Sequence, residues 1–226
     1  MQAVILAAGK GSRLLPLTQK LPKPLIKVAG LSLIERVLSS LPDNITEIII
    51  VVGYKANLIK KYLGKDWHGK KIIYVYQSEQ RGTFSALNAA SSILKNKFLV
   101  LAADVIYKKK DLEKLALQPL SILVRKEKAL NKPLARCVIK RGLLYKLEEK
   151  VIAKGEVFVN CAAYCLDKRI FKELVFYGSN GEEWLSSMVG TLASHSPVFA
   201  VLATCHFTIT NTEEIDLCKR YLSTRQ

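Results

Sequence analysis

Long hydrophobic runs are absent from this sequence of 226 residues, although 50% of its residues are hydrophobic. The longest apolar stretches, 48–52 and 98–103, have the length of strands and fall short of the roughly 18 residues that a membrane-spanning helix needs. No basic segment precedes the first apolar residues, so we interpret 1–6 as the first strand and not as a signal peptide. We therefore expect a cytoplasmic protein with a substantial core and no membrane partner.

Acidic residues are also few, with 19 Asp and Glu against 35 Lys and Arg, which gives a formal net charge of +16. The basic residues are spread along the whole chain without an aromatic-interleaved motif. This distribution favours small polyanionic substrates over a nucleic-acid partner. The five cysteines form no Cys-x-x-Cys pair, which favours reduced thiols over a zinc site or a set of disulfides.

Strand-like and helix-like segments alternate in the first half of the chain. The strand-like segments are 3–8, 47–52, 71–76 and 98–103, and the helix-like segments are 32–41, 56–63 and 83–94. This alternation predicts an α/β fold, with a Rossmann-like, mixed but mostly parallel sheet and helices on both faces.

The second half differs and predicts a small antiparallel insertion. Its strand-like segments are 120–124, 135–140, 143–147, 157–165 and 198–202, and its helix-like segments are 170–175, 183–192 and 213–222. Arg141 and Gly142 suit a hairpin turn between two of these strands. Because no linker or repeat interrupts the pattern, we expect a single domain over residues 1–226.

A glycine-containing loop follows the first strand and is the strongest candidate for a phosphate site. The loop residues that we expect to bind a nucleotide are Ala7, Ala8, Gly9, Gly11, Ser12 and Arg13. Glycines let the backbone N–H groups approach phosphate oxygens, and an arginine adds a permanent charge. Prolines at 16, 22 and 24 exclude the immediate helix of a dinucleotide-binding motif, and no Gly-Lys-Ser/Thr follows four spacers as in a Walker motif.

Lys23 stands between two prolines, which restrict the backbone on either side of it. Alone, this pattern is also typical of a solvent-exposed lysine in a rigid loop. The whole pattern, Gly9-x-Gly11-x-Arg13-Leu14-x-Pro16-x-Thr18 and then Pro22-Lys23-Pro24-Leu25, resembles the N-terminal signature of the NTP-transferase family, the nucleotidyltransferases that make nucleotide sugars. The resemblance implies that Arg13 and Lys23 act on the phosphates of an NTP.

Two further segments extend the resemblance along the chain. Gln77 and the Gly82-Thr83 pair resemble the family's base-recognition stretch, although Gln77 also suits a strand end and Thr83 a helix cap. Asp104 ends an apolar strand as the family's metal-binding aspartate does, which implies a catalytic role for Asp104 and Mg²⁺ as cofactor. The alternative for Asp104 is a cap of the helix that follows.

The segments that would bind the acceptor sugar phosphate match the family pattern less completely. Glu149 and Lys150 resemble the family's Glu-Lys-Pro segment, with Val151 in place of the proline, and Asn160 resembles a sugar contact. Ala163 is expected to stand where the family has the glycine of a Gly-x-Tyr motif. This part is most similar to heptose- and mannose-phosphate nucleotidyltransferases.

A final segment departs from the family at a metal ligand. Ile209 stands where relatives carry a second acid, so the resemblance leaves Asn211 as the substitute ligand. The function implied is transfer of a nucleotidyl group from an NTP to a sugar phosphate, with release of pyrophosphate. Two alternatives stay open: a cytidylyltransferase for phosphocholine or a similar alcohol phosphate, and a catalytically weak regulatory relative that binds nucleotide sugars. A homo-oligomer also stays open.

Overall fold

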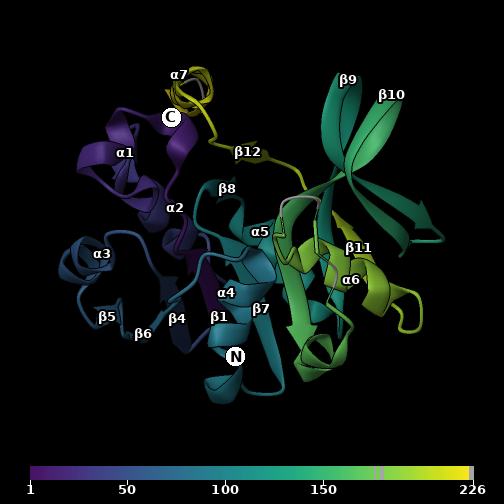
Figure 1. Ribbon diagram of the computed structural model, residues 1–226, viewed down its shortest axis with the longest axis horizontal. Coiled ribbons are helices and arrows are strands. Elements are labelled where there is room, and N and C mark those ends of the chain that lie inside the picture. Colours follow the sequence, from purple (N-terminus) through teal and green to yellow (C-terminus); the bar gives the residue numbers. More distant parts are fainter. Residues whose placement is uncertain (176, 179–180, 224–226) are drawn as a thin grey trace.

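The computed structural model describes residues 1–175, 177–178 and 181–223. Its largest sheet has eight strands in the order β11-β9-β10-β7-β1-β4-β6-β5 (Figure 1). These strands are β1 (Gln2–Ala7), β4 (Glu47–Val52), β5 (Asp66–Trp67), β6 (Lys70–Tyr76), β7 (Lys97–Ala102), β9 (Ser121–Lys140), β10 (Leu143–Asp167) and β11 (Phe199–Leu202). Two small sheets pair β2 (Lys27–Val28) with β3 (Leu31–Ser32), and β8 (Val105–Tyr107) with β12 (His206–Thr208).

The centre of the sheet is parallel. β1 lies between β4 and β7, and β6 continues the parallel arrangement beyond β4. β4 reads Glu-Ile-Ile-Ile-Val-Val and is buried from its second residue on, as expected for a strand that is covered on both faces. Because β1 and β7 run in the same direction, their carboxyl ends meet at one edge of the sheet, where ligands bind in folds of this kind.

Helices cover both faces, as the sequence predicts. The helices are α1 (Leu17–Lys20), α2 (Leu33–Ser39), α3 (Ala56–Leu63), α4 (Thr83–Ala89), α5 (Lys109–Leu117), α6 (Leu185–Ala193) and α7 (Thr212–Ser223). One core cluster packs α2, α3 and α5 on the sheet, and a second packs α4 and α6 on the opposite face. The α/β prediction with a mostly parallel sheet is therefore confirmed.

The antiparallel insertion is a long hairpin of β9 and β10. Four segments that the sequence predicts as separate strands are joined here into two, with register shifts where they bend. The predicted turn is confirmed, because Arg141 and Gly142 take φ values of 50° and 77°, which suit a two-residue hairpin. After this turn β10 begins beside β11, where Leu143 pairs with Phe199.

Other elements differ from the sequence prediction. The expected helix at 170–175 is only a 3-10 turn, Lys168–Lys172. The prolines near the glycine loop limit this region to single turns: 3-10 turns at Ser12–Leu14 and Lys23–Leu25, and the four-residue α1. β8, α5 and β12 were not predicted as elements, since each is short or rich in lysine.

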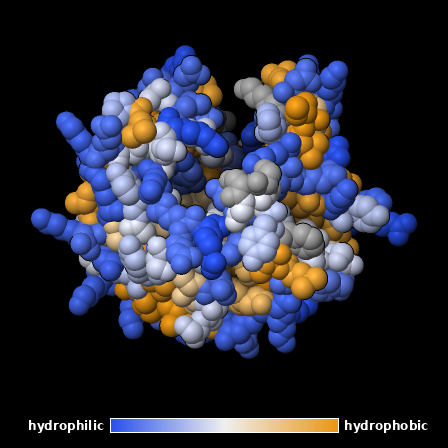
Figure 2. Space-filling model, viewed as in Figure 1, coloured by the Kyte–Doolittle hydropathy of each residue, from blue (hydrophilic) through white to orange (hydrophobic). Residues whose placement is uncertain are grey.

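The C-terminal segment returns to the N-terminal half of the chain. β12 lies between the α1–α7 side of the molecule and the β9–β10 hairpin (Figure 1), and α7 packs near β2 and α2. A third core cluster holds this segment in place and consists of Leu14, Ile26, Val28, Leu33, Ile106, Ile209, Ile215 and Cys218. Figure 2 shows the hollow that lies between the two sides, with hydrophilic residues around it. No helix in the described ranges is long and apolar enough to cross a membrane.

Candidate active site

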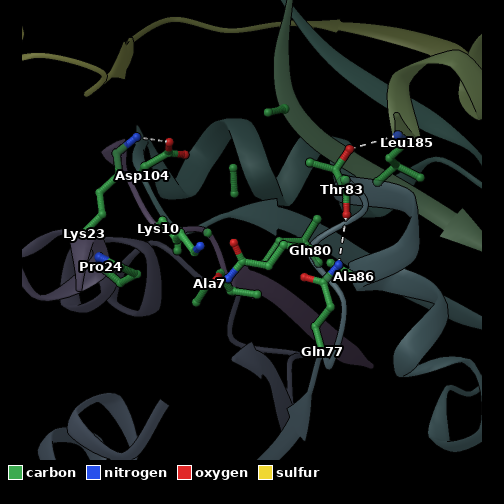
Figure 3. Close-up of a pocket in the computed structure, with 18 of the residues that line it drawn as sticks. Ala7, Lys10, Lys23, Pro24, Gln77, Gln80, Thr83, Ala86, Asp104 and Leu185 are labelled. Atoms are coloured by element: carbon green, nitrogen blue, oxygen red, sulfur yellow. Dashed lines mark hydrogen bonds and ion pairs between the residues drawn. The ribbon is translucent and has the colours of Figure 1, made fainter. Parts of the chain in front are cut away.

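A cavity of about 630 Å³ opens at the carboxyl ends of β1 and β7. Its walls come from residues 6–13, 23–24, 77, 80, 82–83, 86, 100, 102–104, 162, 164, 182 and 184–185. Figure 3 shows Lys23 and Asp104 pointing toward one another on one side of the cavity, and Gln77 and Thr83 on the other, with Ala7 and Lys10 between them. The cavity therefore joins the glycine loop to two segments that lie 70 to 100 residues further along the chain.

The glycine loop requires a glycine at position 11 for two reasons, its backbone angle and the close packing around it. Gly11 takes a φ of +65°, and a Cβ at this position would lie 2.9 Å from Cβ of Lys23 and 3.1 Å from Cγ2 of Thr18. The Thr18 hydroxyl donates a hydrogen bond to the Gly11 carbonyl at 3.1 Å. Only glycine therefore fits here, and its close packing brings Lys23 against the loop.

Lys23 and Asp104 form an ion pair at the floor of the cavity. The ammonium of Lys23 donates to Oδ2 of Asp104, and their side chains are 14% and 30% exposed. Asp104 lies two residues after the end of β7 and is succeeded by a strand, β8, and not by a helix. The alternative in which Asp104 caps a helix is therefore wrong.

The residues predicted for base recognition form a compact turn at the start of α4. Nε2 of the buried Gln77 donates to the Gly82 carbonyl at 3.2 Å and to Oγ of Ser85 at 3.3 Å. Since a carbonyl oxygen only accepts, these contacts fix which atom of the Gln77 amide is the nitrogen. The amide oxygen of Gln77 is left facing the interior of the cavity (Figure 3).

The segment before α6 closes this side of the cavity. Gly82 takes a φ of +117°, and a Cβ there would lie 2.4 Å from the Glu183 carbonyl oxygen. The Thr83 hydroxyl accepts a hydrogen bond from the backbone N–H of Leu185 at 2.9 Å. Thr83 therefore joins two segments across the cavity wall and does not act as a side-chain cap of α4.

The expected acceptor residues lie beside the cavity and do not line it. The ammonium of Lys150 lies 4.6 Å from the ring centroid of Trp184, and Trp184 is one of the lining residues. Burial raises the pKa of the Glu149 carboxyl, while a hydrogen bond with Ser186 and the charge of Lys150 act in the opposite direction. Lys150 therefore contacts the cavity wall through Trp184, and Glu149 lies behind it.

The wall next to Asp104 contains a bulge in β10. Ala162 lines the cavity and takes a left-handed φ of 51°. Oδ1 of Asn160 accepts a hydrogen bond from the Ala162 N–H at 2.9 Å, and Nδ2 of Asn160 donates to the Tyr164 hydroxyl at 2.6 Å. Asn160 therefore shapes this wall from behind.

The prediction for Ala163 is wrong. Ala163 is completely buried in the first core cluster and pairs with Leu101 of β7. The position that would favour glycine is Ala162, because only Ala162 of this pair has a positive φ.

The predicted second metal position is apolar. The backbone N–H of Ile209 donates to the Asp104 carbonyl at 3.0 Å, so residue 209 lies directly beside the predicted metal ligand. Its side chain, however, is fully buried in the third core cluster. No group of three or more metal-binding side chains occurs in the part of the chain that the structure describes.

The structure gives Asn211 a different role from the predicted one. It precedes α7, and its Oδ1 accepts a hydrogen bond from the Glu214 N–H at 2.9 Å. Oε2 of Glu214 accepts in return from the Asn211 N–H at 3.2 Å, which completes a capping box. Because the exposed Asn211 is the helix cap and does not line the cavity, we do not retain it as a metal ligand. The Asn-x-x-Glu spacing was the signal for this cap in the sequence.

Most of the predicted nucleotide residues meet in the cavity. The lining includes Ala7, Ala8, Gly9, Gly11, Ser12, Arg13, Lys23, Gln77, Gly82, Thr83 and Asp104. The sequence prediction missed Lys10, Gln80, Ala162, Tyr164 and Trp184, which also line it. Lys10 could have been found, because it stands between the two glycines of the loop. Gln80 donates to the Ala8 carbonyl at 2.9 Å, a contact over 72 residues that no local pattern indicates.

Comparison with known proteins supports the family resemblance that the sequence motifs indicate. Residues 2–134 match the family model described as nucleotidyl transferase. A D-glycero-alpha-D-manno-heptose 1-phosphate guanylyltransferase of Campylobacter jejuni is 29% identical over 203 residues, which cover 88% of this chain and 91% of that protein. The bifunctional protein GlmU of Methanocaldococcus jannaschii is 30% identical over 200 residues, which cover 88% of this chain and 48% of that protein.

Solved structures share the fold. A putative glucose-1-phosphate thymidylyltransferase from Bacillus anthracis superposes with a TM-score of 0.86 over 98% of this chain and 94% of that one, at 20% identity. The chain spans only part of the GlmU relatives that it matches, 25% of one from Methanococcus maripaludis and 48% of the one above. The family match nevertheless covers more than half of the sequence, from the first strand through the glycine loop and Asp104 into β9, and this chain belongs to the nucleotidyl transferase family.

Proposed function

We propose that the chain transfers a nucleotidyl group from an NTP to a sugar phosphate and so makes a nucleotide sugar. A phosphate oxygen of the acceptor attacks the α-phosphorus of the NTP, the bond from the α-phosphorus to the bridging oxygen breaks, and pyrophosphate leaves with that electron pair. The observation that carries the proposal is the cavity that joins the glycine loop, the Gln77–Gly82 turn and the Lys23–Asp104 pair. Such a reaction needs positioning and charge neutralisation, and no covalent protein intermediate.

The basic residues of the cavity suit a triphosphate. Lys10, Arg13 and Lys23 come from the glycine loop and the segment after it, and all three line the cavity. Arg13 and Lys23 neutralise phosphate oxygens, and the mostly buried Lys23 is held in place by Asp104. The Gln77 oxygen, facing inward, accepts a hydrogen bond from the edge of a base.

The carboxylate that we propose as metal ligand is Asp104, beside Lys23. Mg²⁺ commonly binds through one or two carboxylates together with substrate phosphates, so Asp104 fits this ion although Ile209 replaces the second acid. When bound, the ion would offset negative charge on the phosphates. Lys23 contributes a second positive charge at the same carboxylate.

The acceptor is proposed from the relatives and from the chemistry of the wall. The Campylobacter jejuni relative aligns over almost its full length, and its name specifies a heptose 1-phosphate as acceptor. In this chain Lys150 supplies the charge for an acceptor phosphate, and Trp184 supplies an apolar surface for a sugar ring. We therefore propose a hexose or heptose 1-phosphate as acceptor, in a cytoplasmic enzyme.

The test measures release of pyrophosphate by the purified chain. Each of five nucleoside triphosphates (ATP, GTP, CTP, UTP and dTTP) is combined in turn with each member of a panel of acceptor phosphates. The panel contains glucose, mannose, glucosamine and heptose 1-phosphates, and phosphocholine. We expect turnover with at least one sugar 1-phosphate in the presence of Mg²⁺, and loss of that turnover in Asp104→Asn. Turnover with phosphocholine alone would overturn the acceptor class. Tight binding of a nucleotide sugar without turnover of any pair would favour the regulatory alternative.

A further inference from the structure

A buried tyrosine lies beneath the proposed active site and connects its two halves. Tyr107 is 5% exposed and ends β8, three residues after Asp104. Its hydroxyl accepts a hydrogen bond from the backbone N–H of Ala102 at 3.2 Å and donates one to the carbonyl of Ala162 at 2.9 Å. Ala102 is the last residue of β7, two residues before Asp104, and Ala162 belongs to the bulge in β10.

The bulge at Ala162 needs support on both sides. An alanine at a φ of 51° is strained in a way that glycine is not. Two side chains hold the two polar groups of this residue: Asn160 accepts from its N–H, and Tyr107 donates to its carbonyl. Burial raises the pKa of the Tyr107 hydroxyl far above its ordinary value, so the hydroxyl keeps its proton and remains a donor.

We propose that Tyr107 is a positioning residue for the transfer reaction, and that its hydroxyl fixes the distance between the strand end that carries Asp104 and the acceptor wall at Ala162. The inference rests on the proposed function, with Asp104 holding the metal and the Ala162 wall, which is shaped by the predicted sugar contact Asn160, facing the acceptor. Tyr107 itself does not line the cavity and touches no substrate. Its effect therefore reaches the reaction only through Ala102 and Ala162.

The kinetic test is Tyr107→Phe, which removes the hydroxyl and keeps the ring. Since one hydrogen bond of this kind corresponds to about a tenfold change in an equilibrium, we expect kcat/KM for the acceptor to fall about tenfold. KM for the NTP should change less than about twofold, because the glycine loop and the Gln77 turn do not contact Tyr107. Tyr74→Phe is the matched control, since the Tyr74 hydroxyl donates to the Gly64 carbonyl at 2.6 Å, far along the sheet from the cavity.

A second substitution tests whether Tyr107 acts through Ala162. Glycine adopts a positive φ freely, so Ala162→Gly should remove most of the need for Tyr107. In the Ala162→Gly background we expect Tyr107→Phe to cost less than about threefold in acceptor kcat/KM. An equal loss in both backgrounds, or an equal loss for NTP and acceptor, would overturn the proposal. So would a Tyr107→Phe chain that fails to fold in either background, because the hydroxyl would then be a requirement of the core alone.

A measurement without turnover separates this inference from the proposed function. Hydrogen exchange at the Ala102 and Ala162 amides should accelerate in Tyr107→Phe, and the Tyr74→Phe control should leave both amides unchanged. Unchanged exchange at both amides would overturn the coupling even in an active enzyme. If no NTP and acceptor pair gave turnover, the proposed function would fail, and the exchange rates would still decide whether Tyr107 links the two walls.

Discussion

Replacing Ile209 with aspartate would place a second carboxylate near Asp104, whose carbonyl accepts a hydrogen bond from the Ile209 N–H. The structure opposes this change, because the Ile209 side chain is fully buried among apolar residues of the third core cluster. Loss of a large buried aliphatic side chain costs about 2–5 kcal/mol, and a buried carboxyl adds a cost of desolvation. We therefore expect Ile209→Asp to lower the free energy of unfolding by about 4 kcal/mol or more, out of the roughly 5–15 kcal/mol typical of a folded domain.

The assay is thermal unfolding of both proteins with increasing Mg²⁺. For a chain of this size, about 4 kcal/mol corresponds to a fall in Tm of roughly 8–16 °C. Ile209→Val is the control, and its expected cost of about 0.5–1.5 kcal/mol should lower Tm by a few degrees. Because burial raises the pKa of a carboxyl, the variant should be most stable below pH 4 relative to wild type and lose stability as pH rises. An unchanged Tm together with half-maximal activity at lower Mg²⁺ would refute this reasoning and show that the position can serve as a ligand.

Three further predictions concern single side chains. Lys23→Ala should lower kcat by roughly 10²–10³ while the melting curve stays two-state, since the phosphates lose a positioned charge; wild-type kinetics would remove Lys23 from the mechanism. Gly82→Ala should weaken NTP binding and lower Tm together, because its Cβ would overlap the Glu183 backbone at 2.4 Å; a wild-type Kd for the NTP in calorimetric titration would contradict this expectation. Glu149→Gln should flatten the dependence of stability on pH above about 4. Because the pKa of Glu149 is raised in the folded state, its contribution to stability is greatest below its unfolded-state pKa and falls as pH rises through its folded-state pKa. Denaturant titrations at several pH values should therefore show a smaller change of unfolding free energy with pH than in wild type.

The parallel half of the fold was predictable because its signals are local. The parallel strands β1, β4, β6 and β7 each contain a short apolar run, and the β-branched run of β4 indicates burial on both faces. The capping box of Ser32 and Glu35 marks the start of α2, and the structure contains both of its hydrogen bonds. Helix and strand periodicity therefore carried this half without information from distant residues.

The antiparallel half was predicted less well because its bends are set by distant contacts. The segments 120–124 and 135–140 look separate in sequence, and the polar residues between them give no sign that the strand continues. Their continuity depends on pairing with β10 across the long hairpin. Similarly, β12 is three residues long and is defined by its pairing with β8, about 100 residues earlier.

The nucleotide side of the candidate site was predictable for a different reason from the acceptor side. The glycine loop and Lys23 are close in sequence, so their motif records their proximity in space. Trp184 and Ala162 reach the cavity only through folding of the hairpin and the segment before α6, and no spacing rule connects them to Asp104. Ala162 shows the limit most clearly, because the residue with the positive φ became evident only from its backbone angle.

The third core cluster joins the two ends of the chain. Leu14 follows the glycine loop and Ile26 follows Lys23, and both pack against Ile209 and Ile215 from the C-terminal segment. A chain emerging from the ribosome therefore carries its glycine loop from the beginning, but the loop gains this apolar backing only when residues beyond 209 have been released. We expect the nascent chain to form a competent phosphate site only after α7 has left the ribosome, and proteolytic removal of α7 to loosen the glycine loop although the two lie far apart in the sequence.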